Sequence, residues 1–270
     1  MNKTILITGS TDGIGKLTAL KLAQDGHTIF IHGRNASKVN AVVTEIKNKS
    51  KNSNIIGLVA DFSNLETVLK MANEVKEKCS NLDLLINNAG VFKSTENLGY
   101  HGFDIRFVVN YLAPFILTKA LIPVLQKGYD TRIINLSSAA QTSVSDATLS
   151  GNSIHDASTS YAQSKLAITM WSFYLAKQEP TITVIAVNPG SLLNTKMANE
   201  AYGQHWSPAE KGVNILYDLA IQKEHASDSG KYFDNDRGVF AKAHPDAYNK
   251  DKIEALITIT NNIYDDVVNA

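Results

Sequence analysis

The chain has 270 residues, of which 44% are hydrophobic and 19% are charged, a composition ordinary for a soluble globular protein with a large core. Lysine plus arginine and aspartate plus glutamate both number 26, so the formal net charge is zero and no basic surplus favours a nucleic acid as partner. The single cysteine, Cys79, is expected to be a half-buried helix residue; it excludes disulfides within the chain, and the isolated histidines lead us to expect no structural metal.

No targeting or membrane segment is recognisable in the sequence. Residues 1–8 run directly into an apolar strand pattern, without the basic start and cleavage site of a signal peptide. No run of about 18 apolar residues occurs, so we expect no membrane span and a cytoplasmic protein. No segment rich in proline, serine or glycine separates two halves, so we expect one domain over residues 1–270.

Short apolar runs rich in β-branched residues alternate with amphipathic stretches along the chain. They are Thr4–Thr8, Thr28–His32, Ile55–Ala60, Leu82–Ile86, Arg132–Leu136, Thr183–Val187 and a shorter run near Gly230–Phe233. The first six are almost continuous in Ile, Val and Leu, as expected of strands that helices cover on both faces. The alternation predicts an α/β fold with a Rossmann-type, doubly wound, mostly parallel sheet of seven strands and helices on both faces.

Several of the intervening stretches carry helix signals. Asn35 can cap a helix over Ser37–Lys49, and Ser63 with Glu66 forms a capping-box pair before the next helix. Further helices are predicted over Phe103–Leu121, from Ser207 or Pro208 onward, and over about Asp246–Tyr264.

A glycine-rich turn follows the first strand and opens the first helix. It consists of Gly9, Ser10, Thr11, Asp12, Gly13, Ile14 and Gly15. Glycines at such a turn let the backbone approach a phosphate closely, and the helix N-terminus offers free N–H groups with partial positive charge. A tight turn with close helix packing is the alternative, but the place of the turn in the first βαβ unit favours the pyrophosphate of a dinucleotide.

The end of the second strand indicates which dinucleotide binds. An NAD-selective protein usually has a carboxylate there for the ribose 2′-hydroxyl, whereas this chain has Gly33 and Arg34. A permanently charged guanidinium suits a 2′-phosphate, so the sequence predicts NADP(H) over NAD(H). A solvated surface arginine is the alternative, and the nearby Asp12 argues electrostatically against a phosphate.

Four motifs in chain order resemble those of the one-domain branch of the short-chain dehydrogenase/reductase family, and they span nearly the whole chain. They are Thr8–Gly15 (T-G-x-x-x-G-x-G), Asn87–Gly90 (N-N-A-G), Tyr161–Lys165 (Y-x-x-x-K) and Asn188–Gly190 (N-P-G). Their style is similar to that of retinol-dehydrogenase-like and WW-domain-oxidoreductase-like members. The usual membrane anchor or added domain of those members is not recognisable, so the resemblance does not imply a retinoid substrate.

The resemblance implies a catalytic tetrad of Asn110, Ser138, Tyr161 and Lys165. Residues four apart on a helix share a face, so the Lys165 ammonium is expected near the Tyr161 phenol, where it would lower a pKa that is normally about 10. Ser137 and Ser138 both follow the fifth strand, and alternation lets one of them face the crevice; the resemblance favours Ser138, which would bind the substrate oxygen. Asn110 would support a water beside Lys165, with a satisfied core asparagine as the alternative.

The resemblance also counts Tyr161 and Lys165 among the cofactor-binding residues, and it implies further cofactor contacts by position. Asp61, after the third strand, would lie beside the adenine, unless it is a helix cap. The central ribose would be bordered by Asn88, Ala89 and Gly90. The nicotinamide would be bordered by Pro189, Gly190 and Thr195, the last of which could bond its carboxamide.

Two segments are expected to shape the substrate site. A long polar insert over residues 139–160 resembles a lid or rim, and residues 191–212 are predicted to form a substrate lid. The apolar side chains of the second segment would suit an apolar, mid-sized alcohol or carbonyl; they are Leu192, Leu193, Met197, Tyr202 and Trp206.

The sequence thus predicts an oxidoreductase that transfers a hydride between NADP(H) and the carbonyl or alcohol group of a small or mid-sized organic substrate. A catalytically silent NADP(H)-binding sensor or scaffold protein is the alternative, although a broken tetrad would be expected of it. The family's sugar-nucleotide epimerases have a different glycine spacing, T-G-x-x-G-x-x-G. By resemblance, the helices beginning near Gly102 and Ser160 imply a homodimer or homotetramer.

Overall fold

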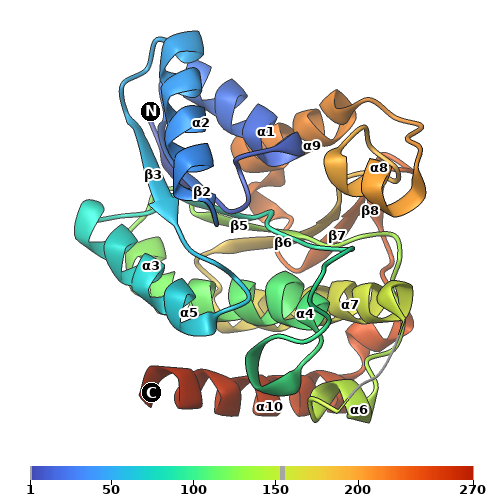
Figure 1. Ribbon diagram of the computed structural model, residues 1–270. Helices are drawn as coiled ribbons and strands as arrows, with labels where there is room; N and C mark the ends of the chain where they lie inside the picture. The colour runs from blue at the N-terminus through green and yellow to red at the C-terminus, as the bar shows by residue number, and fades with distance from the viewer. Residues whose placement is uncertain (1, 153–155, 270) are drawn as a thin grey trace.

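The computed structural model describes residues 2–152 and 156–269, and all of its strands belong to one sheet. The sheet order is β3-β2-β1-β4-β5-β6-β7-β8; the first seven strands pair in parallel and β8 runs antiparallel to β7 (Figure 1). The bounds are β1 Thr4–Ile7, β2 Thr28–Gly33, β3 Ile55–Val59, β4 Leu84–Asn87, β5 Arg132–Leu136, β6 Thr183–Asn188, β7 Lys231–Asp234 and β8 Val239–Ala241. The predicted parallel, doubly wound sheet is confirmed.

The number of strands differs from the prediction, because the sheet has eight strands and not seven. The additional strand, β8, has only three residues, Val239–Ala241, and ends the sheet at its edge. A run this short has no alternation that distinguishes it from a loop, which is why the sequence did not indicate it.

Helices cover both faces of the sheet, as predicted (Figure 1). One face packs against α1 (Gly13–Gln24), α2 (Ala36–Ser50) and α9 (Ala209–Ile221), and the other against α3 (Leu65–Lys78), α5 (Ala113–Leu125) and α7 (Ala157–Gln178). Because strands alternate their side chains, Ile5 and Ile7 pack with the first group and Leu6 with the second. The order reverses at β1, from which the chain builds outward first through β2 and later through β4. Ligands of open α/β sheets bind at such a switch point.

Helix starts follow the predicted signals in part. Asn35 caps α2, since its Oδ1 accepts the Lys38 N–H at 2.9 Å, as predicted. The Ser63–Glu66 capping box is wrong: Asn64 caps α3 by accepting the Glu66 N–H at 3.0 Å, and the Ser63 hydroxyl donates to Asp61 at 2.8 Å instead. Asn64 is one residue closer to the helix and satisfies the free N–H groups of its first turn, so Ser63 has no capping role.

Two long helices also differ from their predicted bounds. The stretch expected as one helix from Phe103 is divided into α4 (Ile105–Phe107), a π-helical turn (Val108–Leu112) and α5. The last helix, α10, spans Lys250–Asn269, because a 3₁₀ turn at Pro245–Tyr248 precedes it. Two short helices, α6 (Asp146–Leu149) and α8 (Lys196–Tyr202), lie in the segments predicted to border the substrate. Cys79 lies half-buried at the end of α3, as predicted.

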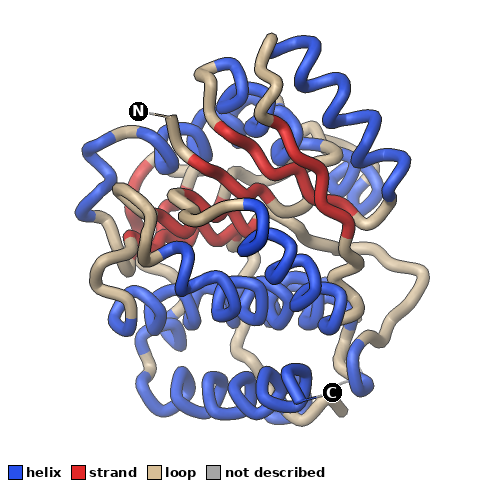
Figure 2. The backbone as a smooth tube through the Cα atoms, turned by 90° about the vertical axis from the view of Figure 1, so that its left-hand side faces the viewer, coloured by secondary structure: helices blue, strands red, loops and turns tan. Residues whose placement is uncertain are grey.

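The last helix, α10, forms an additional layer outside α5 and α7 (Figure 2). The Tyr111 hydroxyl, fully buried, lies 2.8 Å from Thr260 Oγ1, and Lys119 donates to Asn261 at 2.8 Å. Lys119 also lies 4.0 Å from the centre of the Tyr264 ring. The chain's own last helix therefore covers part of the outward face that the family resemblance assigns to subunit contacts, and the predicted homodimer or homotetramer stays a prediction.

One stretch among the described residues, Ile105–Leu125, is long and apolar enough to cross a membrane by length and composition alone, with a mean hydropathy of 1.7. About 72% of its most apolar part is buried inside the fold, between the sheet and the helices around it. A buried core helix of a soluble protein can be equally long and apolar. The predicted absence of a membrane span and the predicted cytoplasmic location stay predictions.

Candidate active site

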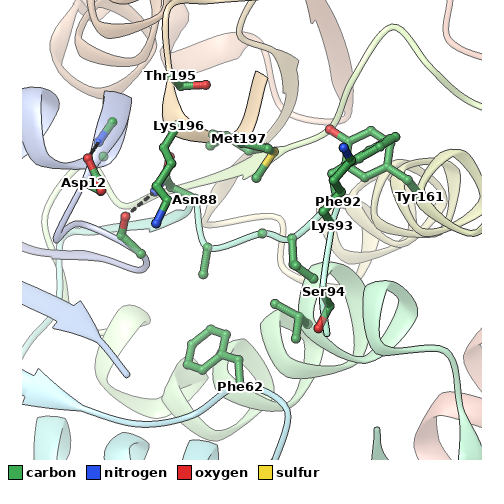
Figure 3. Close-up of a pocket in the computed structure, with 18 of the residues that line it drawn as sticks. Asp12, Phe62, Asn88, Phe92, Lys93, Ser94, Tyr161, Thr195, Lys196 and Met197 are labelled. Carbon is green, nitrogen blue, oxygen red and sulfur yellow. Dashed lines mark hydrogen bonds between the residues drawn. The ribbon is translucent and has the colours of Figure 1, made fainter. Parts of the chain in front are cut away.

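A cavity of about 920 Å³ opens at the carboxyl ends of the central strands. The loops that follow β1 to β6 all contribute to its lining, so residues from six separate parts of the chain meet there. Figure 3 shows Asp12 and Asn88 on one side of the cavity and Phe92 and Tyr161 on the other. Of the predicted site residues, all line the cavity except Ser10 and Asn110.

The glycine turn and the N-N-A-G segment are fitted closely together. A Cβ on Gly9 would lie 2.7 Å from the Ala89 Cα, and one on Gly15 would lie 2.4 Å from the Asn88 amide nitrogen. Asn88 donates to the carbonyls of Thr8 and Gly9 at 2.8 and 3.0 Å. The backbone of α1's first turn can therefore approach a ligand without any intervening side chain, and its N–H groups make a fitting cradle for a pyrophosphate.

Ser10 serves the turn rather than the cavity. It is fully buried; its hydroxyl donates to the Ile7 carbonyl at 2.7 Å and accepts the His32 N–H at 3.0 Å. Burial lowers the pKa of His32 to about 4, so the ring is neutral. Because its Nδ1 accepts the Gly9 N–H at 3.0 Å, its Nε2 carries the proton and donates to the Ala60 carbonyl. His32, which the sequence did not single out, ties the glycine turn to β2 and to the end of β3.

The part of the cavity that follows β2 holds two cations beside one carboxylate. Arg34 and Lys38 both line it, and the Lys38 ammonium lies 2.8 Å from Asp12. The hydrogen bond from Lys38 holds the pKa of Asp12 below its usual value. Asp61 also lines the cavity, and its Oδ1 accepts the Ser63 N–H at 2.9 Å. The negative charge of Asp12, which argues against a phosphate here, is thus balanced by the Lys38 ammonium, a partner 26 residues away in the sequence.

Lys165 and Tyr161 lie one helical turn apart on α7, at the opposite end of the cavity. The Lys165 ammonium is 5.4 Å from the centre of the Tyr161 ring and donates to the Leu136 carbonyl at 2.7 Å. Burial lowers the pKa of Lys165 to about 8. A Cβ on Gly90 would lie 3.8 Å from that ammonium, so the N-N-A-G segment borders the pair directly.

The two serines after β5 face opposite ways, as strand alternation predicts. Ser137 is buried, and its hydroxyl donates to the Lys165 carbonyl at 3.0 Å and contacts Thr169 Oγ1 at 2.7 Å. Ser138 is only half-buried and lines the cavity, where its hydroxyl oxygen accepts the Ala140 N–H at 3.1 Å. Ser138 therefore faces the cavity, and Ser137 fixes α7 to the sheet.

Asn110 lies behind the cavity wall, in the π-helical turn. Its Oδ1 accepts the Val91 N–H at 2.7 Å, and its Nδ2 donates to the Val91 carbonyl at 3.1 Å and to Ser164 Oγ at 3.0 Å. Both the oxygen and the nitrogen of its amide are therefore satisfied, as the alternative of a core asparagine requires. π-helical turns recur at functional sites, and this one brings the asparagine to the wall.

The segment after β6 is fastened from a distant part of the chain. Pro189 and Gly190 line the cavity, and Asp236, in the turn between β7 and β8, accepts the Ser191 N–H at 2.8 Å and the Asn188 amide at 2.9 Å. Nothing in the sequence spacing indicated Asp236. Thr195 caps α8 and lies beside Gly13. A Cβ on Gly13 would lie 3.7 Å from the Thr195 Cγ2, so Thr195 borders the glycine turn.

Apolar side chains gather at the mouth of the cavity. Leu98, Met197 and Trp206 line it with 58%, 36% and 72% of their surface exposed. The side chain of Tyr202 lies outside the described residues, as do residues 153–155 of the polar insert. In the described part of that insert only Ala140 lines the cavity, so the expected lid or rim is not found there. Its polar groups bond to α7 instead, as Thr148 does to Gln163 at 2.6 Å.

Comparison with known proteins decides the family. A family model described as short chain dehydrogenase matches residues 3–205. The chain belongs to the short-chain dehydrogenase family. Retinol dehydrogenase 13 of Homo sapiens is 32% identical over 259 residues, which cover 86% of this chain and 76% of the human protein.

Solved structures agree with this assignment. A short chain dehydrogenase from Burkholderia cenocepacia J2315 in complex with NADP is 29% identical, with a TM-score of 0.68 over 86% of this chain and 95% of that chain. An uncharacterized protein from Mycobacterium paratuberculosis has a TM-score of 0.78 at 22% identity, over 97% of this chain and 93% of that chain, and shows the fold alone. The residues beyond the family match add α9, β7, β8 and α10 to the same core.

Membership in the short-chain dehydrogenase family makes this chain an oxidoreductase of alcohols or carbonyls that uses a nicotinamide cofactor. The cradle, the two cations at the adenosine end and the Tyr161–Lys165 pair are spread along one cavity that fits such a cofactor. Among the residues that the structure describes, no three His, Cys, Asp or Glu side chains are grouped to hold a metal ion.

Proposed function

We propose that this short-chain dehydrogenase is an NADP(H)-dependent oxidoreductase that interconverts the carbonyl and alcohol groups of an apolar, mid-sized substrate. The observation that carries the proposal is that Tyr161, Lys165 and Ser138 line the same cavity as the glycine turn. A proton donor and a hydride source would thus meet at one substrate carbon–oxygen bond.

Each of the three side chains has a separate task in the proposed reaction. When bound, the nicotinamide supplies the hydride that the carbonyl carbon accepts. Tyr161 gives its hydroxyl proton to the carbonyl oxygen, and in oxidation it takes that proton back. The Ser138 hydroxyl donates a hydrogen bond to the same oxygen as negative charge develops on it. The Lys165 ammonium stabilises the phenolate that Tyr161 leaves behind.

The proposed preference for NADP(H) is supported by the balance of charge at the adenosine end. Arg34 offers a guanidinium to the 2′-phosphate, and the ion pair with Lys38 neutralises Asp12. The NADP complex of the Burkholderia relative supports the same preference. Lys38 therefore has an indirect part, since without it Asp12 would repel the phosphate.

Arg34→Leu is expected to raise the Kd of NADPH about 10- to 100-fold, because one charge-assisted hydrogen bond is lost, and to leave the Kd of NADH almost unchanged. Lys38→Met should act in the same direction by exposing the Asp12 charge. Titration of protein fluorescence with each dinucleotide measures both constants. Lys16→Met is the matched control, since Lys16 pairs with Glu45 and does not line the cavity. Equal losses for NADPH and NADH would contradict the preference.

The proposed apolar substrate is supported by Leu98, Met197 and Trp206, which line the same cavity as Tyr161 and are partly or largely exposed. The human relative is named for an apolar alcohol, retinol, which supports the same class without fixing the molecule. A panel of alcohols, aldehydes and ketones of graded chain length, followed by NADPH absorbance, tests it. We expect kcat/KM to rise with apolar length. Tight NADPH binding without turnover across the panel would instead favour the silent sensor or scaffold.

A further inference from the structure

An ion pair beside the site is buried and has no part in the reaction proposed above. The Arg106 and Asp104 side chains are 5% and 7% exposed, and their charged atoms lie 3.2 Å apart. Burying a guanidinium is costly unless every strong donor finds a partner, so a buried arginine in a wall calls for an explanation. Its Nε supplies one, because it donates to the Phe92 carbonyl at 2.7 Å.

Arg106 and Asn110 together hold two consecutive residues of the cavity wall. Asn110 bonds both the N–H and the carbonyl of Val91, and Arg106 bonds the carbonyl of Phe92. The two side chains come from the same helical segment, four residues apart, so they share a face and act in register. We call these four residues the Val91–Phe92 clamp.

The clamp reaches the reacting end through one aromatic ring. Phe92 is buried, lines the cavity and packs edge-on against Tyr161, with ring centres 5.1 Å apart and planes at 64° (Figure 3). Aromatic pairs favour such edge-to-face arrangements, so the position of one ring influences the orientation of the other. A shift of the Phe92 backbone would therefore move the ring that stands against the phenol.

We propose that Arg106 is a positioning residue which, through the Phe92 backbone and ring, sets the orientation of the Tyr161 phenol and the shape of the substrate end of the cavity. The proposal rests on the function proposed above, in which Tyr161 transfers the proton. It assigns no contact between Arg106 and substrate or cofactor.

The chain contains a matched control for this arginine. Arg132 is also buried, is also paired with the aspartate two residues before it, Asp130, and also donates to backbone carbonyls, those of Leu219 and Gln222. It begins β5, at the end of the strand remote from the cavity, and does not line it. Replacing either arginine by methionine removes an ion pair with an aspartate and a bond to a backbone carbonyl, so an effect on the site in one variant alone reports on the place of that arginine.

The test compares Arg106→Met, Phe92→Leu, the double variant and Arg132→Met by kcat, KM, NADPH Kd and the pH profile of kcat. We expect Arg106→Met to lower kcat about 10- to 100-fold, the scale of a misplacement of about 1 Å, with NADPH Kd within about 2-fold of the parent. Phe92→Leu should reproduce most of the loss, and the double variant should be no worse than the worse single variant. Arg132→Met should lower Tm and leave the kinetics of the folded protein unchanged.

Titration of the Tyr161 phenol provides a readout that needs no turnover. The ultraviolet difference spectrum between the parent and Tyr161→Phe isolates its ionisation, and we expect Arg106→Met and Phe92→Leu to move that titration while Arg132→Met does not. An unmoved titration together with parental kinetics, or an equal kinetic loss in Arg132→Met, would overturn the clamp. If the parent turns over nothing, the proposed function fails, and the titration still judges the clamp.

Discussion

Tyr161→Phe is expected to lower kcat by about 10²- to 10⁴-fold, the usual contribution of a positioned general acid or base. The substitution removes one hydroxyl and keeps the ring that packs against Phe92, so the wall of the cavity stays in place. The remaining rate would come from hydride transfer with water as the proton source. Stopped-flow or steady-state absorbance of NADPH measures the loss.

NADPH binding and the variant Ser138→Ala provide the controls for Tyr161→Phe. NADPH Kd should remain near the parental value, since Asp12 of the glycine turn lies on the opposite side of the cavity from Tyr161 (Figure 3). Ser138→Ala should lose less than Tyr161→Phe in kcat, because it removes one hydrogen bond and leaves the proton donor. Turnover in Tyr161→Phe within about 2-fold of the parent would remove the phenol from the mechanism.

Lys165→Met is expected to abolish most turnover and, at the same time, to raise the free energy of unfolding of the cofactor-free chain at pH 7. Burial lowers the pKa of Lys165 from 10.5 to about 8, a difference that corresponds to roughly 3 kcal/mol against the folded state. Loss of the bond to the Leu136 carbonyl costs about 1 kcal/mol, so the net gain should be near 2 kcal/mol.

The gain should depend on pH in a definite direction. Between about pH 8 and 10.5 the unfolded chain binds more protons at this site than the folded chain, so the stability of the parent rises with pH through that window. The advantage of Lys165→Met should therefore be largest below pH 8 and disappear by about pH 10.5. Urea unfolding of both variants at pH 7 and pH 10 measures the difference.

Lys177→Met is the matched control, because Lys177 lies on the same helix α7 but is exposed. It should change stability little, and by the same amount at both pH values. A Lys165→Met variant that is less stable than the parent at pH 7 would show that burial of the ammonium carries no cost. The expected gain in the free energy of unfolding would mean that the parent chain retains a buried lysine at the expense of its stability.

Much of the fold was predictable because it follows from periodicity. The parallel strands are runs of Ile, Val and Leu bounded by polar turns, and each lies within a few residues of its predicted place. The errors concern features that periodicity does not record. The strand Val239–Ala241 is too short to alternate, and the π-helical turn at Val108–Leu112 has the same apolar residues as an ordinary helix.

The candidate site was predictable where its residues are close in sequence. The glycine turn and the Tyr161–Lys165 spacing fix their geometry locally, within one loop or one helical turn. His32, Lys38, Arg106 and Asp236 were missed because the partners that link them to the site, described above, lie 14 to 48 residues away, and only the fold brings them together. Such contacts depend on tertiary packing, which single positions in a sequence do not encode separately.

The outermost layer makes the twenty residues of α10 part of the same folded core as the sheet. Without Lys250–Asn269, the enclosed hydroxyl of Tyr111 would lose Thr260 and meet water, and the hydrophobic surface now shared with Leu256, Ile257 and Ile263 would be bare. Uncovered surface of that kind tends to associate with other molecules. A shortened version of this protein would therefore be prone to self-association for a reason unrelated to its chemistry.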